Sequence, residues 1–124
     1  MFKSIYYKFK TNREKREREA LDLDTIKALK NAGSDLSKPH YIEHHFTVID
    51  KCNIAKITEI LKNKGYEVSE VYEEIDKSGR EYFFFDGCKY CLVEPKIIFQ
   101  ESKEMSELAI SFNEVYDGWG TKVE

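Results

Sequence analysis

The strongest constraint on how this chain can fold is a run of four consecutive aromatic residues, Tyr82, Phe83, Phe84 and Phe85. In a strand, successive side chains point to opposite faces of the sheet, so this run is apolar on both faces. A strand with apolar side chains on both faces is typical of the middle of a sheet that is covered on both sides. We therefore expect a central strand here, and the rest of the sequence must provide its neighbours and its cover.

Hydrophobic spacing divides the remainder of the 124 residues into helices and strands. The predicted order is a helix (12–32), a strand (40–50), a helix (53–65), a hairpin (66–75 and 81–93), a helix (103–116) and a short strand (119–123). Gly33 and Pro39 end the first helix, because glycine accepts a positive φ and proline cannot continue a helix. We expect Asp86 and Gly87 to interrupt the second strand of the hairpin, as a bulge.

Without its first helix, this order is the β-α-β-β-α-β unit of the α+β class. It predicts a ferredoxin-like sandwich, with an antiparallel sheet, two helices on one face and an extra N-terminal helix. Residues 1–38 are expected to form a basic segment with the leading helix and a linker, and residues 39–124 the ferredoxin-like domain. The leading helix, a second copy in a homo-oligomer or a binding partner must cover the other face of the sheet.

Charge and composition exclude several classes of function. The net charge is −3, too close to neutral for a general nucleic-acid binder, and it divides into +5 over residues 1–18 and −8 over the rest. No apolar run approaches the ~20 residues that cross a bilayer, and the first ten residues lack the apolar core of a signal peptide. We expect a cytoplasmic protein with reduced cysteines and with no membrane contact or sequence-specific nucleic-acid contact.

Two clusters resemble catalytic or metal sites. Cys88 and Cys91 have the C-x-x-C spacing of zinc and redox motifs, but residues three apart in a strand face opposite ways. His44 and His45 are neighbours in a strand and also diverge, so His44 is expected to lie in the core. A metal-dependent hydrolase built on His44, His45 and Cys91 is the weaker alternative. With no nucleophilic triad and no phosphate loop in the sequence, we expect no catalytic residues, no cofactor, no metal and no enzymatic activity.

Five residues are candidates for contacting a partner protein. Tyr41, Glu43 and His45 share one face of the predicted strand 40–50. Glu43 and His45 form there either a pair that faces solvent or the leading helix, or a recognition patch beside the aromatic strand. Asp117 and Trp119 lie in a glycine-containing turn. Trp119 is there either as an exposed binding anchor or as a side chain that fills the end of the core.

Several short motifs together resemble the ribonuclease E regulator B family, RraB. They are Ala32-Gly33-Ser34-Asp35, Tyr41-Ile42-Glu43-His44-His45-Phe46, Gly65-Tyr66-Glu67-Val68 and Tyr116-Asp117-Gly118-Trp119-Gly120-Thr121. The resemblance extends over residues 12–124. It implies a ferredoxin-like domain and a protein that binds and inhibits a ribonuclease of the ribonuclease E type, without cofactor or metal. A toxin-neutralising immunity protein or another interaction module of the same fold is the alternative, because an acidic domain that caps a basic protein needs the same physical properties.

Overall fold

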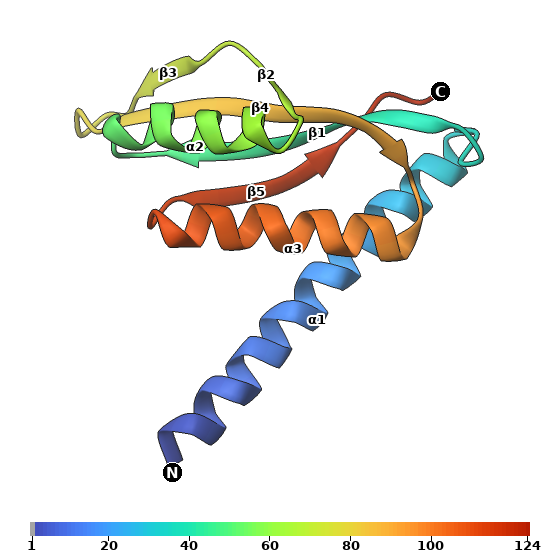
Figure 1. The fold of residues 1–124 in the computed structure, drawn as a ribbon, viewed down its shortest axis with the longest axis horizontal. Helices are drawn as coiled ribbons and strands as arrows, with labels where there is room; N and C mark the ends of the chain where they lie inside the picture. The colour runs from blue at the N-terminus through green and yellow to red at the C-terminus, as the bar shows by residue number, and fades with distance from the viewer. Residues whose placement is uncertain (1) are drawn as a thin grey trace.

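An antiparallel sheet forms the centre of the fold (Figure 1). The structure is a computed structural model that describes the backbone of residues 2–124 and the side chains of residues 14–124. The elements are α1 (Phe2–Asn31), β1 (Pro39–Val48), α2 (Cys52–Asn63), β2 (Glu67–Val68), β3 (Tyr72–Ile75), β4 (Glu81–Leu92), α3 (Pro95–Ser111) and β5 (Val115–Gly120).

Strand β4, which contains the aromatic run predicted to be central, lies in the middle of the sheet together with β1. The strand order is β2-β4-β1-β5, and β3 also pairs with β4. In this register Phe46 lies opposite Phe85, and the two rings stack with their centroids 5.6 Å apart. The α+β prediction, with an antiparallel sheet, is therefore confirmed.

Helices α2 and α3 cover one face of this sheet. Along β1 every second side chain is buried, and Phe46 and Val48 pack with Ile57 of α2 and Met105 of α3. Such alternation is expected of a strand that has one face on the core and one face toward solvent.

Strand β4 is continuous, so the predicted interruption at Asp86 and Gly87 is wrong. A Cβ atom added to Gly87 would lie 3.1 Å from Cδ1 of Leu61 in α2. Glycine at this position therefore lets α2 approach the sheet closely and does not break the strand. The break in strand pairing lies instead beside β4, where residues 69–71 of the same chain separate β2 from β3.

Helix α3 begins and ends earlier than the predicted helix 103–116. It starts at Pro95, where the missing N–H of proline costs no helical hydrogen bond. It ends because Asn113 adopts a positive φ of 56° and the Glu114 N–H donates to the Ala109 carbonyl over 2.9 Å. Tyr116 consequently belongs to β5, which pairs with β1 through a bulge at Asp117.

Helix α1 lies beside α3, and so it does not cover the free face of the sheet (Figure 1). Its Leu29 packs with Ile42, Ile98 and Trp119 on the helical side of the sheet. The side chains of the basic residues up to Arg13 lie outside the described residues. No helix in the described part of the chain is long and apolar enough to cross a membrane.

Candidate functional site

The face of the sheet opposite the helices has no covering element among the described residues. We call it the open face. It carries the alternate side chains of β1 and β4, most of them half-buried: Tyr41, Glu43, His45, Thr47, Tyr82, Phe84, Asp86 and Cys88. Aromatic rings and carboxylates thus share one uncovered surface in the middle of the sheet.

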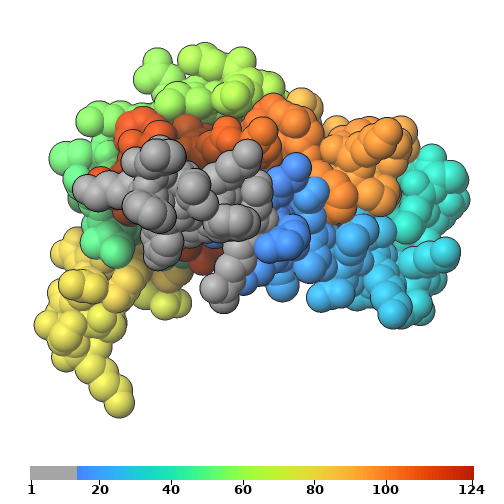
Figure 2. Space-filling view, turned by 90° about the horizontal axis from the view of Figure 1, so that it is seen from below, coloured from blue at the N-terminus to red at the C-terminus, as the bar shows by residue number. Residues whose placement is uncertain are grey.

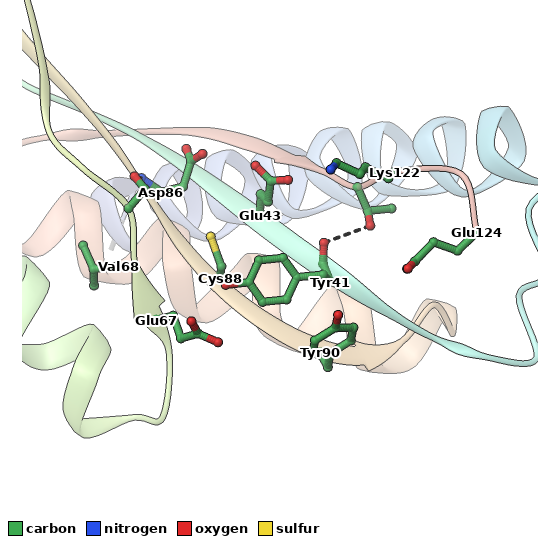
Figure 3. Close-up of a pocket in the computed structure, with 11 residues that line it drawn as sticks. Tyr41, Glu43, Glu67, Val68, Asp86, Cys88, Tyr90, Lys122 and Glu124 are labelled. Carbon is green, nitrogen blue, oxygen red and sulfur yellow. Dashed lines mark hydrogen bonds between the residues drawn. The ribbon is translucent and has the colours of Figure 1, made fainter.

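One end of the open face is hollowed into a pocket of about 520 Å³ (Figure 3). Its wall comes from β1, β2 and the residue after it, β4, and the segment after β5. It consists of Tyr41, Glu43, Glu67, Val68, Ser69, Asp86, Cys88, Tyr90, Thr121, Lys122 and Glu124. Four of these residues carry carboxylate side chains and one carries an ammonium group. The pocket is therefore acidic.

Two groups in the pocket wall are held in their neutral forms. Burial raises the pKa of Tyr41 to about 12, and the nearby Cys88 and Glu67 add to the shift. Burial and the charge of Asp86 raise the pKa of the Cys88 thiol to about 11. Since a thiol with a raised pKa is a poor nucleophile at neutral pH, Cys88 acts here as a packing residue. The Tyr41 ring also packs against Tyr90, with centroids 4.9 Å apart.

Several polar residues of the open face are held by hydrogen bonds between neighbouring strands and segments. His45 Nδ1 lies 2.7 Å from Oδ1 of Asp86 on the neighbouring strand. The backbone N–H of Asp86 donates to the Ser69 hydroxyl over 2.8 Å. The Thr47 hydroxyl donates to the carboxylate of Asp117, which brings the bulge residue of β5 onto the same face. The structure thus gathers four of the five predicted partner-binding residues, Tyr41, Glu43, His45 and Asp117, on one surface.

The fifth candidate, Trp119, lies on the helical side and is only 8% exposed. Its indole N–H donates to Asp22 Oδ1 over 3.0 Å, and the Ser102 hydroxyl donates to the other oxygen of Asp22 over 2.5 Å. Of the two interpretations of Trp119, the structure supports the one in which it fills the end of the core.

The structure does not bring together His44, His45 and Cys91, the three residues of the hydrolase alternative. His44 is fully buried on the helical side, where its Nδ1 lies 2.8 Å from the Tyr116 hydroxyl and burial lowers its pKa to about 3. Cys91 also points to that side and donates to Glu101 over 2.9 Å, whereas Cys88 faces the pocket. Within residues 14–124, no group of three His, Cys, Asp or Glu side chains is arranged to hold a metal ion.

Sequence reasoning missed part of the pocket wall. Glu67 lies opposite Cys88 through the pairing of β2 with β4, and Lys122 and Glu124 arrive from the segment after β5. The only signal in the sequence was the Gly65-Tyr66-Glu67-Val68 motif, which carried no information on register.

Comparison with known proteins matches residues 19–121 to the family described as "Regulator of ribonuclease activity B". A relative of that name from Haemophilus influenzae is 36% identical over 108 residues, which are 87% of this chain and 71% of the relative. Relatives of the same name from Actinobacillus succinogenes (92% of this chain, 80% of the relative) and Pseudoalteromonas atlantica (79% and 84%) are 32% and 33% identical. The described fold is the one that the motif resemblance implied, and the chain belongs to the RraB family.

Proposed function

We propose that this protein is a non-catalytic regulator that binds a ribonuclease of the ribonuclease E type in the cytoplasm and lowers its cleavage of RNA. The family and the names of its relatives support a regulatory role toward a ribonuclease. The observation that carries the direct-binding mechanism is the open face. This face is a half-buried aromatic surface in the middle of the sheet, and none of the three helices covers it.

The charge of the open face favours a protein partner over RNA. The pocket wall carries the carboxylates of Glu43, Glu67, Asp86 and Glu124 around the single ammonium of Lys122. Phosphate groups are repelled by such a surface, whereas a basic patch on an RNA-binding enzyme is attracted to it. The −8 charge of residues 19–124 extends the same attraction to longer range.

The chemistry of the pocket supports a role without catalysis. Burial raises the pKa values of the Tyr41 phenol and of the Cys88 thiol in the pocket wall, so both groups are protonated at neutral pH. An activated nucleophile next to a general base is the usual requirement for covalent catalysis. Neither Tyr41 nor Cys88 meets it.

A cleavage assay with matched charge reversals tests this function. Purified ribonuclease E from the host is incubated with a labelled RNA and increasing amounts of the full chain, and the cleavage rate is measured. We expect the wild type to inhibit cleavage and Glu43→Lys, on the open face, to weaken inhibition about tenfold or more. Glu59→Lys changes the net charge equally but lies exposed on α2, and it should inhibit within about twofold of the wild type.

The two variants separate location from net charge. Equal weakening by both variants would show that only the overall charge matters, and the open face would lose its role. Cleavage that is unaffected by an excess of the wild type would refute the proposed function itself.

A further inference from the structure

The outer edge of β3 is unusually exposed for a strand that joins a sheet. All four of its residues are exposed, and the large apolar side chains Val71, Tyr72 and Ile75 are 43%, 65% and 63% exposed. The hairpin that contains β3 projects from the body of the molecule, where it is coloured yellow in Figure 2. The hairpin is therefore accessible to another chain from its outer side.

The hydrogen-bond pattern shows which backbone groups of β3 are free. The Asp76 N–H donates to the Arg80 carbonyl over 3.0 Å, which makes Asp76 and Arg80 a hydrogen-bonded pair at the end of the hairpin. Because such pairs alternate along an antiparallel ladder, Glu74 and Tyr72 also bond to β4. The N–H and C=O groups of Glu73 and Ile75 then point away from β4, and no described residue pairs with them.

Proteins usually protect such an edge with a short strand, charged side chains, proline, a bulge or a covering element. Strand β3 has only four residues and carries the charges of Glu73 and Glu74, which repel an acidic strand but attract a basic one. Residues 71–75 of this chain contain neither proline nor lysine, and no described helix lies over them. A groove of about 360 Å³ runs beside the strand on the open face, lined by Thr47, Glu74, Ile75, Asp76, Tyr82 and Phe84. A strand added to β3 would have its backbone on the free edge and a side chain over this groove.

The acidic charge beside the outer edge of β3 indicates which kind of chain can pair with it. Residues 69–76 include the four acidic residues Glu70, Glu73, Glu74 and Asp76 and no basic residue. Asp76 is held ionised, since hydrogen bonds from Ser78 and from the Arg80 N–H keep the pKa of its carboxyl below the usual range. A second copy would bring like charges together, which destabilises strand pairing, whereas lysine or arginine beside Glu73 and Glu74 stabilises it.

We propose that β3 is a docking edge on which an extended basic segment of the regulated ribonuclease adds as a further strand of the sheet. Backbone hydrogen bonds to Glu73 and Ile75 supply affinity, and the carboxylates around them supply selectivity for basic side chains. This inference rests on the proposed function and extends it, because it identifies the partner segment as extended and basic and places it beside the open face.

Amide hydrogen exchange on the isotope-labelled full chain tests the docking edge. In the complex with purified ribonuclease E, exchange at the amides of Glu73 and Ile75 should slow about tenfold or more. The amides of Tyr72 and Glu74 already bond to β4 and should change less. Unchanged exchange at Glu73 and Ile75 in a complex that still inhibits cleavage would overturn the docking edge and leave the proposed function standing.

A proline variant tests the proposed hydrogen bond from the Ile75 N–H to the partner strand by removing its donor. Ile75→Pro removes an N–H that points outward, a position at which an edge strand tolerates proline. It should weaken binding of the ribonuclease about tenfold, while Ile75→Thr keeps the N–H and should bind within about twofold of the wild type. Equal binding by both variants contradicts the proposal. If the proline disturbs the hairpin, Glu73→Lys, which keeps the backbone intact, must weaken binding in the same assay.

A probe peptide keeps the test independent of the ribonuclease. If the wild type binds no ribonuclease, the proposed function fails, and the edge is tested with a ten-residue peptide of alternating lysine and valine. Protection of Glu73 and Ile75 by this peptide, and not by one of alternating glutamate and valine, supports the docking edge. Protection by neither peptide overturns it. Dimerisation of the chain alone with these amides protected would identify a second copy as the occupant and would also overturn it.

Discussion

At the residue scale, the side chains most sensitive to substitution are the polar ones buried between the sheet and the helices. His44 is fully buried between Tyr66 and Tyr116, and its Nε2 has no hydrogen-bond partner among the described residues. Asp22 of α1 is 4% exposed and accepts hydrogen bonds from Ser102 and Trp119. Because buried polar groups are costly when they lose their partners, these residues give sharp predictions.

His44 makes stability depend on pH. Burial lowers its pKa from 6.5 in the unfolded chain to about 3 in the fold, so between these values the unfolded state binds more protons. Its contribution is fully present above pH 6.5 and is lost as the pH falls toward 3. The free energy of unfolding of the wild type, relative to His44→Phe, should fall by about 1–2 kcal/mol between pH 7 and pH 5. Urea titrations at both pH values measure this difference, and a constant difference would contradict the burial of His44.

Asp22 fastens α1 to the rest of the fold. Asp22→Ala should lower the free energy of unfolding by about 1–3 kcal/mol, because it leaves the buried Trp119 indole N–H without its acceptor. The Ser102 hydroxyl also loses its shorter hydrogen bond and keeps only the Phe99 carbonyl at 3.3 Å. Burial raises the pKa of Asp22, so part of this loss is offset by removal of a desolvated carboxylate. The exposed Asp24 of the same helix is the matched control, and Asp24→Ala should change the urea midpoint little. Equal effects of the two variants would refute the role of Asp22.

The sequence predicted the environment of some of these residues better than others. Strand alternation alone placed His44 in the core and His45 on the other face, because period two is a local property. The burial of Asp22 was not predicted, because Asp22 lies in a helix rich in charged residues and is buried by contact with α3 and β5. Its partner Trp119 follows 97 residues later in the chain, and spacing contains no information on such a contact.

At the element scale, the close approach of α2 to β4 depends on one glycine. Gly87→Ala places a Cβ atom 3.1 Å from Cδ1 and 3.2 Å from Cδ2 of the fully buried Leu61. We expect a loss of about 1–3 kcal/mol in the free energy of unfolding, measured by urea titration. Gly120→Ala is the control, because its Cβ atom meets only His45 Nε2 at an ordinary 3.5 Å.

A second substitution checks the cause of that loss. In the Gly87→Ala background, Leu61→Val makes room for the added methyl group, so the double variant should be more stable than the two single losses added together. Strict additivity would show that the contact between Leu61 and Gly87 is not the source of the destabilisation.

The sequence predicted which segments form helices and strands better than it predicted how these elements pack against one another. The central position of β4 was predicted because its aromatic run needs cover on both faces, and the pairing confirms it. The end of α3 differed from the prediction because Asn113 adopts a positive φ, a conformation that apolar periodicity does not detect. The start differed because Pro95 begins the helix before the apolar stripe from which the helix was predicted. The leading helix was one of the elements expected to cover the open face. It packs against α3 on the helical side instead, because a helix can bury its apolar residues on either side of a sheet.

At the scale of the whole molecule, charge and shape together define how a partner approaches. Residues 19–124 carry −8, and the acidic pocket lies on the open face of the sheet. The affinity for ribonuclease E, the partner that we propose, should therefore decrease about tenfold or more when the salt concentration rises from 0.05 to 0.5 M, mainly through slower association. Surface plasmon resonance at several salt concentrations measures both rate constants. An affinity that is unchanged or stronger at high salt would rule out electrostatic attraction to the acidic surface.

The central claim is that the open face is the surface that the ribonuclease contacts. The most direct measurement is a map of amide chemical-shift changes in the isotope-labelled full chain as purified ribonuclease E is added. The changes should concentrate at Tyr41, Glu43, His45 and Asp86, with little change along the exposed side of α2 at Glu59. Changes confined to α2 and α3, with the open face unaffected, would contradict the account.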